Sequence, residues 1–360
     1  MKVMTILGTR PEIIRLSRII PLLDRYTKHI LVHTGQNYDF HLNEVFFNEL
    51  KVRQPDYLFD CRADSPMEEI GKILCHCEKA IRTEKPDRIL ILGDTNSALS
   101  AFVAKRYGIP VFHMEAGNRC YDDRVPEEVN RRIIDHCSDI LMPYTERSRA
   151  NLIREGIDGK RIYVTGNPIL EVLDYYRPAI ESSQALTKYR LTQGGYFLVT
   201  LHRAENVDEE ERLRNFIKAF QRIYQHYQMP IICSLHPRTR HQLEKQNLTM
   251  DSEGIIAVKP LGLFDFIHLE KHAACVLTDS GTVQEECCIF QIPNITLRDV
   301  TERPETIESG SNIVTGCEPD AILNAVQIAL DTACQWTAPS EYTQMHVSRT
   351  VIKIVLGAIE

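Results

Sequence analysis

The chain has 360 residues, of which 43% are hydrophobic and 25% are charged. At roughly 150 residues per domain this length predicts two domains, and the composition excludes a small disulfide scaffold, a collagen-like chain and a disordered chain. The formal net charge of -7 is the wrong sign for a protein that neutralises many phosphates, so no nucleic-acid partner is expected.

Short apolar runs alternate with amphipathic segments along the whole chain, which is typical of a doubly wound α/β fold. The strands predicted in the first half are residues 3–8, 30–34, 88–93, 110–114, 140–142 and 162–166. Those predicted in the second half are residues 196–200, 230–234, 255–258, 275–278, 294–297 and 312–315. The pattern predicts two sheets of about six strands, covered by helices with a 3.6-residue apolar period.

The boundary between the two halves is predicted within residues 166–195, because residues 177–195 contain Pro, Ser and a Gly pair but no strong strand. We therefore expect an N-terminal α/β domain of residues 1–170 and a C-terminal α/β domain of residues 171–340. Residues 341–360 are predicted to form a final helix.

No apolar run approaches the roughly 18 residues that span a bilayer, and the apolar start at residues 3–7 is interpreted as a strand, so no membrane insertion is expected. The 11 cysteines are scattered, which fits free thiols in a reducing cytoplasm. Cys75-His76-Cys77 is the densest group and lacks a second pair to complete a zinc site. No metal is predicted.

Polar clusters follow most of the predicted strands directly. They occupy residues 8–12, 34–37, 93–97, 115–119, 202–206, 236–238 and 279–282. Ligands of open α/β sheets bind at the carboxyl ends of the strands, so two such edges predict a cleft between the domains.

Asp279-Ser280-Gly281-Thr282 opens a predicted helix, where free N–H groups and small residues suit a phosphate. An ordinary helix N-cap explains the same residues equally well. Arginines near strand ends or in loops favour the phosphate interpretation, because their planar fork suits a diphosphate; they are Arg10, Arg203, Arg238 and Arg303. No G-x-G-x-x-G or P-loop sequence occurs, and no cofactor is predicted.

Three carboxylates stand out in the first half. Asp94 and Glu115 follow apolar strands, where a carboxylate is costly unless it has a role or a partner. Glu127 follows Pro126 at a helix start, where the helix dipole and a pair with Arg131 explain it equally well. His202 and His236 follow strands of the second half, and each is either a structural histidine or a group that contacts anionic oxygen.

In this order, the clusters resemble the non-hydrolysing UDP-N-acetylglucosamine 2-epimerase family over essentially the whole chain. The matching segments are residues 8–12, 93–95, 115–117, 126–131, 202–206, 279–286 and 301–305. The resemblance implies an isomerase with two Rossmann-like domains in a glycosyltransferase-B-like arrangement around a UDP-sugar cleft. It also implies a C-terminal helix that returns to the first domain, and a homodimer.

The resemblance also implies a mechanism and roles for matched positions. UDP would be eliminated to give a 2-acetamidoglycal and then added back, with C2 protonated from the opposite face. The predicted catalytic residues are Asp94, Glu115, Glu127 and His202. The predicted UDP-binding residues are Arg10, Arg15, His236, Phe266, Ser280, Gly281, Thr282, Glu286 and Arg303, of which Arg15 replaces a family lysine and Thr282 a family glycine.

The substrate stays open between two pairs. Residues 34–47 and 114–120 look more like the subgroup that converts UDP-2-acetamido-2,6-dideoxy-L-talose into UDP-N-acetyl-L-fucosamine for capsule or O-antigen synthesis. The family's regulatory Thr-Gly-Gln-His segment, which binds a second UDP-N-acetylglucosamine, reads Thr34-Gly35-Gln36-Asn37 here. Alternative functions are a hydrolysing 2-epimerase, a glycosyltransferase that uses a UDP-sugar donor, and a non-catalytic nucleotide-sugar sensor.

Overall fold

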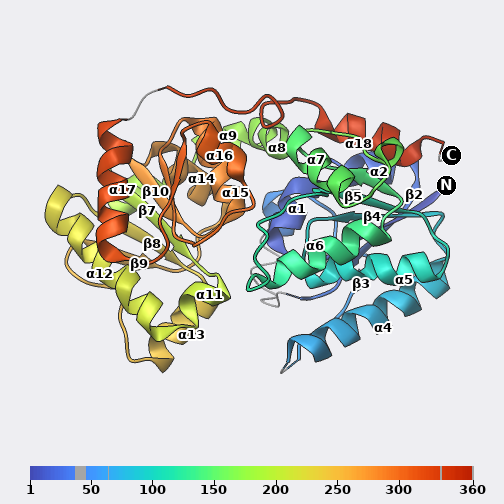
Figure 1. The fold of residues 1–360 in the computed structure, drawn as a ribbon, viewed down its shortest axis with the longest axis horizontal. Coiled ribbons are helices and arrows are strands. Elements are labelled where there is room, and N and C mark those ends of the chain that lie inside the picture. Colours follow the sequence, from blue (N-terminus) through green and yellow to red (C-terminus); the bar gives the residue numbers. More distant parts are fainter. Residues whose placement is uncertain (37–45, 64, 333–334, 359–360) are drawn as a thin grey trace. The chain divides into compact units, whose positions relative to one another are not determined.

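The computed structural model describes residues 1–36, 46–63, 65–332 and 335–358. The chain divides into two compact units (Figure 1): unit 1 is Met1–Tyr175 with Ser340–Glu360, and unit 2 is Tyr176–Pro339. Each unit contains one six-stranded parallel sheet. The predicted α/β class with two sheets of six strands is confirmed.

The sheet of unit 1 has the strand order β3-β2-β1-β4-β5-β6. Its strands are β1 (Lys2–Leu7), β2 (Lys28–His33), β3 (Tyr57–Leu58), β4 (Arg88–Leu92), β5 (Val111–Met114) and β6 (Ile140–Met142). Apart from their first residues, β1, β2 and β4 are buried throughout, as expected for a sheet covered on both faces.

The strand predicted at residues 162–166 is wrong. Only Ile162 forms a bridge, to Leu141, and the segment continues beside the end of β6 through bonds from Tyr163 N to Leu141 O and from Thr165 N to Pro143 O. Pro143 has no N–H group to donate back, so a regular ladder cannot continue there. The sixth strand is the two-residue β3 instead.

Helices surround the sheet of unit 1. They are α1 (Arg10–Leu16), α2 (Ile20–Tyr26), α4 (Pro66–Glu84), α5 (Ser100–Arg106), α6 (Pro126–Cys137), α7 (Glu146–Arg154), α8 (Ile169–Tyr175) and α18 (Val347–Leu356), with 3-10 turns at Asn96–Leu99 and Gly159–Arg161. The C-terminal α18, red in Figure 1, packs against α2. Ser348 at its start bonds to Glu171, and Arg88 donates to the carbonyl of Val355 at its end.

The sheet of unit 2 has the order β12-β11-β10-β7-β8-β9. Its strands are β7 (Phe197–Leu201), β8 (Ile231–Leu235), β9 (Ile255–Val258), β10 (Cys275–Thr278), β11 (Asn294–Thr296) and β12 (Asn312–Val314). Its helices are α9 (Arg177–Glu181), α10 (Ala185–Tyr189), α11 (Ala204–Val207), α12 (Glu210–Tyr227), α13 (Pro237–Lys245), α14 (Leu263–His272), α15 (Gly281–Phe290), α16 (Pro304–Glu308) and α17 (Pro319–Asp331). The segment predicted as a linker therefore carries two short helices, α9 and α10.

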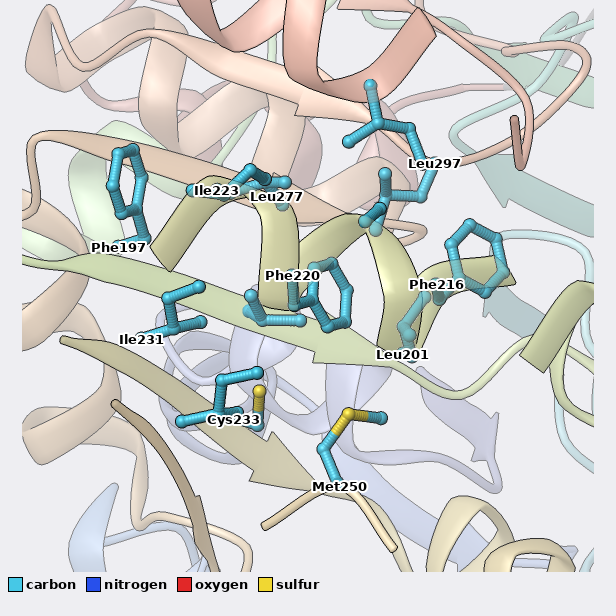
Figure 2. Packing of buried hydrophobic residues seen from close by; sticks show 14 of the residues in the cluster. Phe197, Leu201, Phe216, Phe220, Ile223, Ile231, Cys233, Met250, Leu277 and Leu297 are labelled. Atoms are coloured by element: carbon cyan, nitrogen blue, oxygen red, sulfur yellow. The ribbon is translucent and has the colours of Figure 1, made fainter. Parts of the chain in front are cut away.

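The core of unit 2 forms between its sheet and the long helix α12 (Figure 2). Phe216, Phe220 and Ile223 recur on one face of α12 at helical spacing, and all are fully buried against the strands. Each buried side chain of this size contributes roughly 1.5–3 kcal/mol of hydrophobic free energy. The polar loops at the strand ends are therefore anchored to a rigid sheet.

Counted within its own unit, each sheet has the strand order 3-2-1-4-5-6. The order reverses between the first and fourth strands, which are β1 and β4 in unit 1 and β7 and β10 in unit 2. Ligands of this fold bind beyond the carboxyl ends of the strands at that reversal. The loops after these four strands are thus where a site is expected.

Part of the segment 34–47, on which the subgroup prediction rests, lies outside the described residues, as does Asn37. Within the described ranges, no helix is long and apolar enough to cross a membrane.

Candidate active site

The loop after β1 is built around Glu12. The side chain is 2% exposed, and its Oε2 accepts bonds from Gly8 N (3.0 Å), Thr9 N (2.8 Å) and Thr9 Oγ1 (2.7 Å). Burial is the main cause that raises the pKa of Glu12 to about 7, and the negative charge of Asp94 adds to it. A second carboxyl group therefore lies near Asp94 and titrates near neutral pH.

Gly8 permits a close approach of the loops that follow β1, β2 and β4. A Cβ atom at position 8 would lie 2.0 Å from Ser97 Oγ and 2.3 Å from Thr34 Oγ1, and these two hydroxyls are themselves 2.6 Å apart. Gln36 Oε1 accepts bonds from the backbone and hydroxyl of Ser97 at 3.0 Å. The described start of the segment that corresponds to the family's regulatory segment is thus tied to the loop that carries Asp94.

Asp94 follows β4 and is bound by a buried arginine. Its Oδ2 accepts from Arg131 Nε at 2.8 Å and from Arg131 Nη2 at 2.7 Å, while Asn130 Nδ2 donates to its backbone carbonyl at 3.0 Å. The carboxylate is 24% exposed, whereas the arginine is 4% exposed. Arg131 therefore orients the carboxylate of Asp94, which stays partly exposed.

Glu115 follows β5 and is bound by Arg15. The two side chains are 7% and 3% exposed, and Arg15 Nη1 lies 2.6 Å from Glu115 Oε2. Asn118 Nδ2 donates to the other carboxylate oxygen at 3.2 Å. The backbone of Glu115 is left-handed, with φ 63°, which is strained for a residue with a side chain. Arg15 was predicted to bind UDP, and the structure places it against a predicted catalytic carboxylate.

The start of α6 carries two glutamates with different environments. Glu127 lies in the first turn of α6, as predicted, and is half-buried. Glu128 is fully buried and accepts bonds from Cys120 N, Tyr121 N and Arg131 Nη1 at 3.0, 3.0 and 2.6 Å. Burial alone would raise the pKa of Glu128, but these bonds and the charge of Arg131 lower it. Arg131 thus links Glu128 to Asp94.

In unit 2, the loops after β7 and β10 meet at Asp279. The side chain is fully buried and accepts from His202 N and Arg203 N, each at 2.9 Å, and it lies 2.9 Å from His202 Nδ1. Burial alone would raise the pKa of Asp279, but the charge and hydrogen bond of His202 and the backbone donors hold it far below its ordinary range. Because Asp279 holds Nδ1 of His202, Nε2 of the ring points away from Asp279. His202 is 36% exposed.

The loop after β10 leads into α15. Ser280 is the N-cap residue, yet its hydroxyl makes no bond to the helix. Gly281 is fully packed, since a Cβ atom there would lie 2.7 Å from Glu302 Oε1 and 3.7 Å from Arg303 Cζ. Thr282 is half-buried in the first turn. Hydroxyls, a small residue and a guanidinium therefore meet at a helix N-terminus, as an anion site requires.

Arg303 is the N-cap residue of α16 and is 5% exposed. Its Nε donates to the fully buried Glu285, and its backbone N–H donates to Thr301 Oγ1 at 3.0 Å. Arg203 Nη2 lies 3.9 Å from Glu302 Oε1 on the adjoining loop. Two arginines of the predicted phosphate-binding group are thus each paired with a glutamate.

The other predicted UDP-binding residues are spread around unit 1 and unit 2. Glu286 is 3% exposed on α15, and Phe266 is half-buried on α14. His236 caps α13, where its Nδ1 accepts from Arg238 N, and its ring lies 5.8 Å from the ring of His202. Arg10 lies in unit 1, with its guanidinium 5.4 Å from the ring centre of Phe46.

Arg238 and the group Cys75-His76-Cys77 were also singled out from the sequence. Arg238 was grouped with the diphosphate arginines, but its guanidinium pairs with Asp208 on the exposed surface. Cys75, His76 and Cys77 do not converge: Cys75 is exposed, Cys77 is buried, and His76 stacks on Phe59 at 5.0 Å.

The sequence interpretation did not single out Glu12, Glu128 or Asp279 as organising residues. Glu12 and Asp279 both lie in segments that were marked as polar clusters, and each segment follows a strand at the reversal of the strand order. A carboxylate that comes shortly after a strand end can accept hydrogen bonds from nearby backbone N–H groups, and this property could have marked both residues.

Comparison with known proteins points to one family. Residues 23–356 match the family model described as UDP-N-acetylglucosamine 2-epimerase. The chain is 42% identical over 348 residues to a UDP-N-acetylglucosamine 2-epimerase of Methanocaldococcus jannaschii, covering 94% of this chain and 95% of the relative. It is 36% identical over 340 residues to a UDP-2,3-diacetamido-2,3-dideoxy-D-glucuronate 2-epimerase of Pseudomonas aeruginosa, covering 93% and 94%.

A solved structure shows the same similarity in three dimensions. The crystal structure of the M. jannaschii UDP-GlcNAc 2-epimerase in complex with UDP-GlcNAc and UDP superposes with a TM-score of 0.93 at 40% identity, and covers 98% of this chain and 99% of that one.

Proposed function

Because the chain belongs to the UDP-N-acetylglucosamine 2-epimerase family and is an isomerase of the 2-epimerase type, we propose that it inverts C2 of a UDP-2-acetamido sugar by eliminating UDP and adding it back. The observation that carries this mechanism is the placement of Asp94 and Glu115. Both carboxylates follow neighbouring strands of unit 1, and each is bound by a nearly buried arginine.

The chemistry of C2 explains the need for elimination. This carbon lies beside an acetal carbon and no carbonyl group acidifies its proton, so direct removal and return of the proton is too slow. In the proposed first step, a carboxylate takes the C2 proton while the bond between C1 and the UDP oxygen breaks, and the electron pair leaves with UDP. The product of this step is a 2-acetamidoglycal.

The second step reverses the first from the other face. A UDP oxygen attacks C1, and C2 takes a proton from the side opposite to the one that lost it, so the configuration at C2 is inverted. The route requires one carboxyl group on each face of the sugar ring. The proposed acid and base are two of the three carboxylates Asp94, Glu115 and Glu127.

Unit 2 supplies the groups that retain UDP while its bond to the sugar is broken. We assign this role to the start of α15 with Ser280, Gly281 and Thr282, and to the side chains of His202 and Arg303. Fixed N–H groups and cations stabilise the negative charge that develops on the leaving diphosphate. Asp279 holds the ring of His202 in place, so its orientation is set before the substrate arrives.

UDP-N-acetylglucosamine with its 2-epimer UDP-N-acetylmannosamine is the first proposed substrate pair, since the family and the M. jannaschii relative carry that name. The second candidate is the L-talo and L-fuco pair. Asn118 lies in the segment that resembles the L-fucosamine subgroup; it donates to Glu115 Oε1 at 3.2 Å and accepts from Ser148 Oγ at 2.8 Å. The subgroup residue thus shapes the surroundings of a proposed catalytic carboxylate.

Turnover with each nucleotide sugar, with and without added UDP-N-acetylglucosamine as activator, tests the proposal. Proton NMR should reveal the C2 epimer of one pair. Free sugar released in step with UDP would identify a hydrolysing enzyme, and transfer that depends on an added acceptor would identify a glycosyltransferase. Binding of both sugars with none of these products would identify a sensor.

The proposal includes a cytoplasmic homodimer that contributes to surface polysaccharide synthesis, as the family resemblance implies. The ten cysteines of the described residues are all free, which supports a reducing compartment. Light scattering of the purified chain measures the assembly state directly.

A further inference from the structure

His113 lies on β5 within unit 1 and belongs to neither the proposed catalytic set nor the proposed UDP-binding set. Its side chain is 1% exposed. Its Nδ1 lies 2.9 Å from Asp135 Oδ1, and its Nε2 lies 2.9 Å from the carbonyl oxygen of Gly93. Both ring nitrogens are therefore in hydrogen bonds inside the unit.

The two partners of the ring are acceptors. A backbone carbonyl has no proton to donate, and the fully buried Asp135 already accepts from Gly117 N at 3.2 Å and faces Arg119 Nη2 at 2.8 Å. Burial alone would raise the pKa of Asp135, but the hydrogen bond and charge of His113 and the charge of Arg119 lower it. Neither partner can donate a proton to the ring, so both bonds run from a ring nitrogen to an acceptor oxygen.

These bonds reach the loops on either side. Gly93 immediately precedes Asp94 and has φ 74°, and Gly117 follows Glu115 by two residues and has φ 81°. A change in either loop would turn a proposed catalytic carboxylate. The pair of His113 and Asp135 holds the carbonyl group of one loop and the N–H group of the other.

We propose that His113 is a positioning residue for the epimerisation, which fixes Asp94 through the carbonyl of Gly93 and fixes Glu115 through Asp135 and Gly117. The inference rests on the proposed function, because it concerns the positions of the two proposed catalytic carboxylates. Acid–base catalysis is sensitive to these positions, and a misplacement of about 1 Å can lower the rate about 100-fold.

Two substitutions separate the two bonds of the ring. The side-chain nitrogen of Asn overlays Nδ1 of histidine, whereas that of Gln overlays Nε2. His113→Asn therefore keeps the bond to Asp135 and loses the bond to Gly93, and His113→Gln does the reverse. We expect kcat to fall about 10- to 100-fold further in His113→Asn than in His113→Gln, because Asp135 keeps its contacts with Gly117 and Arg119 when its bond to the ring is lost. The KM and the affinity for UDP should stay within about twofold, since most of the proposed UDP-binding residues lie in unit 2.

His29 provides a matched control. His29 is 8% exposed and lies near the start of β2 in the same sheet. Both of its ring nitrogens are also in hydrogen bonds, Nδ1 with Asp24 at 2.7 Å and Nε2 with Thr5 Oγ1 at 2.9 Å. His29→Asn and His29→Gln should lower the thermal stability of the protein. They should leave kcat per folded molecule within about twofold.

Amide hydrogen exchange in residues 93–97 gives a readout that does not depend on activity. Exchange should be faster in His113→Asn than in His113→Gln. Equal exchange in the two variants would overturn the proposal, as would kcat losses that merely follow thermal stability. If the wild-type protein binds UDP but epimerises neither substrate pair, the proposed function fails, and the exchange comparison still decides the positioning role.

Asp135→Asn is the milder variant if the substitutions at His113 prevent folding. It keeps the shape of the side chain and leaves the His113 bond to Gly93 possible. We expect a smaller loss of kcat than in any variant that removes the Gly93 bond; an equal or larger loss would contradict the role assigned to that bond.

Discussion

Glu115 combines two features that rarely coincide without a purpose. Its backbone adopts φ 63°, and its carboxylate is 7% exposed against an arginine. A strained backbone of this kind costs about 1–3 kcal/mol and persists where the surrounding structure imposes it. The bond from Glu115 N to Met142 O and the ion pair with Arg15 provide that constraint. The strain therefore points to a functional carboxylate.

Replacement of the two proposed catalytic carboxylates should separate chemistry from binding. Asp94→Asn and Glu115→Gln keep the size of each side chain but remove its charge and its basicity. We expect kcat to fall about 10²- to 10⁴-fold in each variant, while UDP binds as in the wild type. Calorimetric titration with UDP and NMR assays of turnover check both halves. Full activity in both variants would remove the catalytic assignment.

Glu12 should make the stability of the protein depend on pH. Its pKa rises from 4.5 to about 7 on folding, so between these values the folded state holds a proton that the unfolded state has lost. The contribution of Glu12 to the free energy of unfolding therefore falls as pH rises from about 4.5 to about 7, by up to about 3 kcal/mol, and does not change above that range.

Glu12→Gln removes this titration and should flatten the pH dependence in that window. Urea unfolding at a series of pH values, compared between variant and wild type, measures the difference. A difference between the two proteins that stays constant from pH 4.5 to pH 8 would contradict the raised pKa.

At the scale of elements, the strand ends could be predicted from sequence and the contacts between them could not. The apolar composition of a run such as residues 88–93 predicts a buried parallel strand, and the polar cluster that follows marks the end of that strand. The pair of Arg15 and Glu115 joins positions 100 residues apart, and no local pattern records it. The two-residue β3 is too short to give any periodic signal.

The start of α15 gives a test of the proposed phosphate site. Gly281→Ala places a methyl group 2.7 Å from Oε1 of the buried Glu302, so this side chain has to shift. We expect the dissociation constant for UDP to rise about 10-fold, which corresponds to about 1.4 kcal/mol. Gly71→Ala is the matched control, because Gly71 lies within α4 with no atom within 4 Å of the added carbon. It should leave UDP binding unchanged and stabilise the protein by about 0.5–1 kcal/mol.

At the scale of the molecule, each unit repeats one strand order and carries its polar groups at the same reversal. The carboxylates gather in unit 1, whereas most of the proposed UDP-binding residues gather in unit 2. The sequence revealed this division through the order of its clusters. It did not reveal that Arg15 would serve a carboxylate, since a buried arginine binds an ionised carboxylate and a phosphate with the same planar fork.

The last helix should stabilise unit 1, although about 170 residues separate it from the rest of that unit. Val351 on α18 is fully buried, so Val351→Ala should lower the free energy of unfolding by about 1–2 kcal/mol. Hydrogen exchange should accelerate in α2 and stay unchanged in the helices of unit 2. The exposed Lys353→Ala is the control and should change neither. Acceleration confined to unit 2 would contradict the assignment of α18.

Incorporation of deuterium at C2 tests the central claim most directly. The wild-type protein is incubated in D₂O with UDP-N-acetylglucosamine and, separately, with the L-talo nucleotide sugar, and the product is followed by NMR and mass spectrometry. If UDP is eliminated and C2 is reprotonated from solvent-exchanged carboxyl groups, the epimer formed from one of these substrates carries deuterium at C2. An epimer that retains its original hydrogen at C2 would contradict the account.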